Sequence, residues 1–144
     1  DGHTMSVHRN LPVVLRYLEE RHKWNDIDVI IAGAGWAAHL PGVLDAYLGY
    51  ALGDRRIAVI GVGFEDPDDA RHGTAAELSI SEVPGTRVIF RDEGGHFLGS
   101  NGFLRACRYA VSGDIPDPKE MKPRPTQHRT LDKAIAFLGQ PLST

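Results

Sequence analysis

The sequence predicts an α/β domain built as three layers, with a parallel sheet between two layers of helices. Short apolar runs rich in β-branched residues at 28–32, 57–62 and 87–90 are typical of parallel strands buried on both faces. Segments with apolar residues at helical spacing separate these runs. Strands that alternate with helices in this way favour right-handed crossovers within one parallel sheet.

Length and composition restrict the class of protein. The 144 residues are the usual size of one domain, and 42% hydrophobic with 24% charged residues are ordinary globular values. No apolar run approaches the ~20 residues that cross a bilayer. A net charge of -3 argues against nucleic acid and anionic membranes as partners. Because the first residues have neither a basic start nor an apolar run, we expect a cytoplasmic location.

The individual elements follow from local patterns. The first helix is expected to begin after Asn10, a candidate N-cap, with Pro12 in its first turn. Cys107 lies in an apolar helical segment and is expected to be a buried core thiol. The predicted helices of the domain span residues 11–24, 40–52, 70–81 and 102–110.

The composition changes after residue 111. Four prolines among charged residues between 112 and 129 exclude a helix or a central strand and predict an extended arm. A short helix over 131–138, with Thr130 as candidate cap, carries one apolar face formed by Leu131, Ile135 and Leu138. We therefore divide the chain into an α/β domain (1–111) and a segment of arm and helix (112–144). Because so short a helix is unstable alone, docking on a neighbouring subunit predicts a homo-oligomer.

The first candidate site is the segment Ser6–Asn10, just before the first helix. Free N–H groups and the helix dipole favour an anion there. His8 can exchange a proton near neutral pH, and Arg9 offers a guanidinium that suits phosphate or carboxylate. An ordinary surface loop is the alternative for this segment.

The second candidate site is the glycine-rich segment 33–42, between a predicted strand and a helix. It lies at the carboxyl edge of the sheet, where open α/β sheets bind ligands. The segment also fits the loose dinucleotide pattern G-x-G-x-x-A, but Glu65 comes too late to be the ribose-binding acid. A tight turn with His39 as a cap or core hydrogen-bonding group is the third interpretation. The acidic and histidine-containing segment 92–96 is expected to be a strand-to-helix connection, not a metal site.

Together the two motifs resemble those of the PurE family. Residues 6–10 (Ser-Val-His-Arg-Asn) are similar to that family's Ser-Ala-His-Arg-Thr motif. Residues 32–42 are similar to its Ala-Gly-Ala-Gly-Gly-Ala-Ala-His-Leu-Pro-Gly loop, and one helix and one strand separate the two in both cases. Weaker similarity continues to about residue 110 and includes Asn101. The resemblance implies a flavodoxin-like fold and an octameric assembly.

The resemblance also implies an activity, that of N5-carboxyaminoimidazole ribonucleotide mutase in purine biosynthesis. A carboxylate moves from the exocyclic nitrogen to the ring carbon of an aminoimidazole ribonucleotide, with no metal or organic cofactor. By similarity, His8 is the general acid and base. A closed loop would exclude water and keep carbon dioxide beside the ring carbon. The substrate-binding residues implied are Ser6, Val7, Arg9, Gly33, Ala34, Gly35, Trp36, Ala37, Ala38, His39 and Leu40.

Several features depart from the family pattern. The family's first strand and its Gly-Ser-x-Ser-Asp phosphate loop have no counterpart in this chain, so we expect the chain alone to bind the ribonucleotide weakly. Trp36 replaces a glycine, Val7 replaces an alanine, and residues 64–69 form an acidic loop that would repel phosphate if it faced the site. Direct carboxylation of aminoimidazole ribonucleotide is an alternative within the family. A catalytically silent binding or assembly subunit is the alternative from another class.

Overall fold

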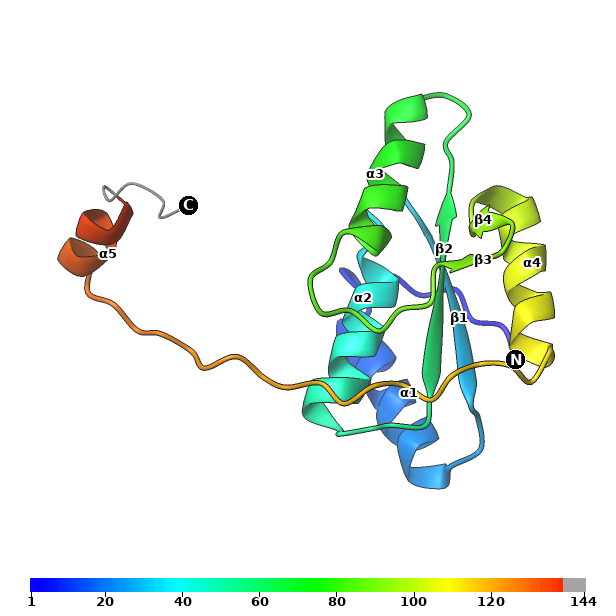
Figure 1. Ribbon diagram of the computed structural model, residues 1–144, viewed down its shortest axis with the longest axis horizontal. Coiled ribbons are helices and arrows are strands. Elements are labelled where there is room, and N and C mark those ends of the chain that lie inside the picture. Colours follow the sequence, from blue (N-terminus) through cyan, green and yellow to red (C-terminus); the bar gives the residue numbers. More distant parts are fainter. Residues whose placement is uncertain (139–144) are drawn as a thin grey trace.

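The computed structural model describes residues 1–138, which form an α/β domain, an extended arm and a separate terminal helix (Figure 1). The predicted segment 112–144 therefore lies partly outside the described residues. The elements in chain order are α1 (Leu11–Trp24), β1 (Val29–Gly35), α2 (His39–Ala46), the π-helix η1 (Tyr47–Ala51), β2 (Ala58–Phe64), α3 (Ala70–Ser81), β3 (Arg91–Asp92), β4 (Gly95–His96), α4 (Gly99–Val111) and α5 (Leu131–Leu138).

The two long strands form the centre of the domain. β1 and β2 are parallel and pair along their full length, from Val29 opposite Ala58 to Gly35 opposite Phe64. Figure 1 shows α1, α2 and α3 on one side of these strands and α4 on the other. The predicted three-layer α/β/α class is therefore confirmed, and both predicted strands extend two or three residues further than expected.

The prediction of a third strand over residues 87–90 is wrong in its extent. Only Ile89 pairs there with β2, as an isolated parallel bridge to Ile60. A second bridge joins Leu98 to Gly63, further along the same edge of β2. Between these two bridges the chain leaves the sheet and forms the antiparallel β3–β4 hairpin. The inserted hairpin interrupts the ladder, so the segment never forms a continuous strand.

That hairpin occupies the segment expected to be a plain connection. Arg105 of α4 holds it by an ion pair with Asp92 and by donating to the carbonyl of Gly95 at 2.7 Å. His96 donates through Nδ1–H to the carboxylate of Glu77 of α3 at 2.6 Å and stacks on Phe90. Because Asp92 and His96 are engaged with neighbouring helices, the segment connects and braces the fold.

The second helix is also shorter than predicted. The α-helical hydrogen bonds of α2 end at Ala46, and residues 47–51 continue as the π-helix η1. Leu52 N–H donates to the carbonyl of Tyr47, five residues earlier. Gly49 in this wider turn leaves the space that the Met121 side chain of the arm occupies. The sequence shows the helical spacing but not the change in pitch.

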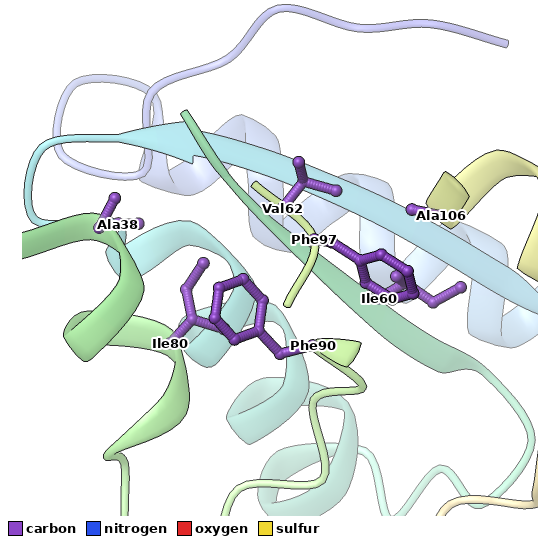
Figure 2. Close-up of a cluster of buried hydrophobic side chains, with 8 residues drawn as sticks. Ala38, Ile60, Val62, Ile80, Phe90, Phe97 and Ala106 are labelled. Atoms are coloured by element: carbon purple, nitrogen blue, oxygen red, sulfur yellow. The ribbon is translucent and has the colours of Figure 1, made fainter. Parts of the chain in front are cut away.

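The core is divided by β2, because successive strand residues point to opposite faces. Val59 belongs to a cluster with Val14 and Leu18 of α1. Ile60 and Val62 belong to the second cluster, shown in Figure 2, in which Phe90 and Phe97 also lie. The interrupted third strand thus still supplies two large aromatic side chains to the core.

Two local predictions are corrected. Asn10 precedes α1, but its side chain makes no cap hydrogen bond to that helix. Its carboxamide oxygen instead accepts from the N–H of Ser6 at 3.2 Å, which closes the turn before the helix. Cys107 is only partly buried, because α4 turns Gly102 and Ala106 to the core and leaves the thiol at the wall of a cavity.

Asp54 is a buried carboxylate that joins α1 to the turn before β2. His22 lies 2.5 Å from its Oδ2, and the N–H groups of Arg56 and Ile57 donate to Oδ1 at 2.8 and 2.7 Å. Burial alone would raise the pKa of Asp54, but the hydrogen bonds from His22, Ile57 and Arg56 outweigh it and lower that pKa below its ordinary value.

We predict a pH-dependent stability loss for Asp54→Asn. A carboxyl whose pKa is lowered on folding adds stability that is fully present above its unfolded pKa and disappears as the pH falls through the folded value. The variant should therefore unfold at lower urea concentration at pH 7, by about 1.5–3 kcal/mol, and match the parent more closely at a pH well below 4. An equal deficit at both pH values in urea titrations would contradict this account.

The first half of the arm lies on the domain. Ile115 packs against the core cluster of Figure 2, and Lys119 accepts a hydrogen bond through its carbonyl from Arg87 at 3.1 Å. Glu120 pairs with Arg55 at 2.8 Å. Beyond Met121 the arm leaves the domain, and Figure 1 shows α5 standing away from it. In the described residues no helix is both long and apolar enough to span a membrane.

Candidate active site

The two predicted motifs meet at the carboxyl end of β1. His8 Nε2 and His39 Nδ1 lie 3.0 Å apart, within hydrogen-bonding distance, although 31 positions separate them in the chain. The two rings meet edge to face with their centroids 5.2 Å apart. Both side chains are exposed. The structure therefore joins the proton-exchanging residue of the first motif to the histidine of the second.

Buried neighbours hold these two exposed imidazoles. Val7 is buried, and the carbonyl of Ser6 accepts from the N–H groups of Arg9 and Asn10, which fixes the turn that carries His8. Ala38 is fully buried next to His39, whose N–H donates to the carbonyl of Ala37 at 2.8 Å. Each motif is thus anchored through one small apolar side chain, and the adjacent imidazole faces solvent.

The His8–His39 pair combines a proton-exchanging group with two nearby helix starts. In the His8–His39 hydrogen bond one ring nitrogen donates and the other accepts, so at least one ring is neutral. His39 is the first residue of α2, and His8 lies three residues before α1. No side chain caps either helix start, so the positive dipole ends of both helices favour an anion beside the pair. The arrangement can exchange a proton beside a bound carboxylate or phosphate.

Not every predicted residue lies at this pair. Gly33 and Leu40 line a mostly apolar cavity of about 610 Å³ between α1, β1 and α4. Among the described residues β1 pairs only with β2, so its other edge forms a wall of that cavity. Neither His8 nor His39 lines it. The cavity is therefore separate from the histidine pair, and we place the candidate chemistry at the pair.

A second aromatic contact lies at this sheet edge. The indole of Trp36 stacks on the imidazole of His72, with centroids 4.0 Å apart and planes 17° from parallel. Trp36 has a left-handed backbone (φ 57°), which suits the glycine that the family has at this position. His72 lies in the first turn of α3, directly after the acidic loop. The tryptophan in place of a glycine was the only signal.

The acidic loop is partly neutralised by its own neighbours. Asp66 Oδ2 lies 2.7 Å from His72 Nδ1, and hydrogen bonds from the Asp68 N–H and from His72 lower the pKa of Asp66. Asp69 caps α3 by accepting from the N–H of Arg71 and pairs with its guanidinium at 2.5 Å. Two of the loop's carboxylates are therefore used in structural contacts. Within residues 1–138, no group of three or more His, Cys, Asp or Glu side chains is placed to hold a metal ion.

Comparison with known proteins identifies the family. A family model described as AIR carboxylase matches residues 1–89, which is more than half of the chain and includes both motifs. The chain belongs to the AIR carboxylase family. The predicted PurE-type membership is thereby confirmed, and with it the fold class.

One curated relative carries a functional name. The N5-carboxyaminoimidazole ribonucleotide mutase of Saccharolobus solfataricus is 36% identical over 84 residues. The alignment covers 58% of this chain and 47% of the relative. The chain thus spans about half the length of the curated relative that it matches.

Proposed function

We propose that this AIR carboxylase family member acts as an N5-carboxyaminoimidazole ribonucleotide mutase. The observation that carries the proposal is the His8–His39 hydrogen bond at the carboxyl end of β1, inside the region that the family model matches. The name of the relative from Saccharolobus solfataricus supports the mutase over direct carboxylation and over a catalytically silent subunit.

The proposed reaction needs one proton to be moved twice. The bond between N5 and the carboxylate carbon breaks, and protonated His8 donates its proton to the nitrogen. Carbon dioxide then forms a bond with ring carbon C4, and the proton displaced from C4 goes to His8. The residue ends in its starting state, so neither a redox partner nor a net proton is consumed. His39 accepts or donates the hydrogen bond that orients the His8 ring.

An assay with two substrates tests the proposal. The chain is incubated with N5-carboxyaminoimidazole ribonucleotide, or with aminoimidazole ribonucleotide and bicarbonate, and the 4-carboxy product is followed by its ultraviolet absorbance. We expect product from the first substrate without added bicarbonate. Product only from the second would make the chain a carboxylase, and product from neither would overturn both.

We also propose that the chain forms a homo-oligomer, held in part by its arm; the family resemblance implies an octamer. The apolar face of α5 supports this proposal, because Leu131, Ile135 and Leu138 are all exposed in the single chain. A three-residue apolar face on an eight-residue helix gains little unless another surface covers it. The extended arm carries that helix away from its own domain (Figure 1).

Light scattering should show an oligomer for the full chain and a smaller species for a version ending at Lys122. That endpoint retains the contacts of Ile115 and Met121 with the domain. Ile135→Ser should weaken assembly because Ile135 is 60% exposed on the apolar face, whereas Lys133→Ser on the same helix should not. A monomeric full chain would defeat the prediction, and an unchanged oligomer after truncation would show that the arm does not hold it.

A further inference from the structure

The Trp36–His72 stack lies at the edge of the sheet where the proposed chemistry takes place. Trp36 follows β1, and His72 lies in the first turn of α3, which follows β2, so both lie at the carboxyl ends of the central strands. Only two positions separate Trp36 from His39. The stack therefore belongs to the same loop as one member of the histidine pair.

The tryptophan is held there against a backbone preference. Its φ of 57° lies in the left-handed region, which disfavours residues with a side chain. His72 supports the indole from one side, and Asp66 at 2.7 Å and Asp69 at 3.9 Å in turn hold the imidazole. The orientation of the Trp36 indole therefore depends on His72, Asp66 and Asp69.

The opposite side of the indole is open. Trp36 remains 62% exposed even though His72 covers one of its faces. A rigid, exposed aromatic ring is a surface on which a planar heterocycle stacks. Asp66 and Asp69 lie 2.7 and 3.9 Å from His72, in an acidic loop that disfavours a phosphate on this side. The matching ligand group is therefore an uncharged planar ring, with its phosphate turned away from α3.

We propose that the outer face of Trp36, supported by His72, binds the aminoimidazole ring of the substrate and helps to select it. This deepens the proposed function and rests on it, because the substrate class is taken from there. Trp36 and His72 are positioning residues in this scheme, and proton transfer stays with His8. We call the outer face of Trp36, with His72 behind it, the platform. It is a feature of this chain, since a glycine at position 36 could not form it.

Fluorescence can report on Trp36 alone, because the chain has only two tryptophans and Trp24→Phe removes the other. The probes are 5-aminoimidazole-4-carboxamide ribonucleotide, its nucleoside and ribose 5-phosphate, each titrated into the millimolar range. We expect saturable quenching by the nucleotide and the nucleoside, and none by ribose 5-phosphate. Absence of saturable quenching by the nucleoside would overturn the platform.

Substitutions at the stack then test its contribution to binding. Trp36→Gly suits the local backbone and should fold, yet calorimetry should show nucleoside affinity reduced about tenfold. Trp36→Phe should retain most of the affinity, and Trp24→Phe should match the parent. His72→Ala should lower the affinity less and lower the fluorescence anisotropy of Trp36. Undiminished nucleoside binding by Trp36→Gly would refute the platform.

The platform and the proposed function can fail separately. If Trp36→Gly turns over substrate with an unchanged KM, the platform falls and the mutase assignment stands. If the parent shows no turnover but the nucleoside quenches Trp36 saturably, the mutase assignment falls and the stacking site stands.

Discussion

Replacing His8 by asparagine should lower mutase turnover about 100-fold or more and leave the fold intact. The side chain is exposed, and its one side-chain hydrogen bond among the described residues goes to His39. Few folding contacts are therefore lost, whereas a carboxamide cannot exchange a proton near neutral pH. Steady-state kinetics, with circular dichroism to verify the fold, would measure the effect.

A matched control is available on the arm. His128 is exposed and lies far from the histidine pair in sequence, so His128→Asn should keep the parent's turnover. If His8→Asn retained parental turnover, His8 would not be the proton-transfer residue. A comparable loss in both variants would point to a general effect of removing a histidine.

Removing Asp45 should produce the largest loss of stability. Its side chain and that of Arg87 are 3% and 6% exposed, and Arg87 Nε donates to Asp45 at 2.9 Å. The backbone N–H of Arg87 donates to the same carboxylate at 2.7 Å. Asp45→Ala would leave a buried guanidinium without its counter-charge, which costs about 3–5 kcal/mol. A chain of this size should then melt roughly 10 °C lower.

Asp28→Ala is the comparison for this variant. Asp28 also pairs with an arginine, Arg56, at 2.9 Å, but its side chain is 85% exposed. Exposed ion pairs contribute about 0–1 kcal/mol, so this change should hardly move the melting temperature. Similar melting temperatures for the two variants in calorimetry would show that burial of the Asp45–Arg87 pair adds no stability.

Local patterns alone were enough for much of the domain. α3 and α5 have the bounds that periodicity predicts, and both long strands follow from their β-branched runs. Helical and strand spacing are properties of neighbouring residues, and burial in a layered α/β domain reinforces them. The two site motifs are also continuous segments, so the sequence displays them directly.

The sequence by itself determined the α/β class, the order of the main elements and the segments that carry the site. Only the tertiary structure decided that a hairpin interrupts the third strand, that His8 meets His39, and that Trp36 stacks on His72. The two side-chain contacts join residues distant along the chain, and the hairpin forms where the chain leaves the edge of β2 between two bridges. Their geometry depends on how the layers pack around β2, and no local pattern of residues encodes that packing.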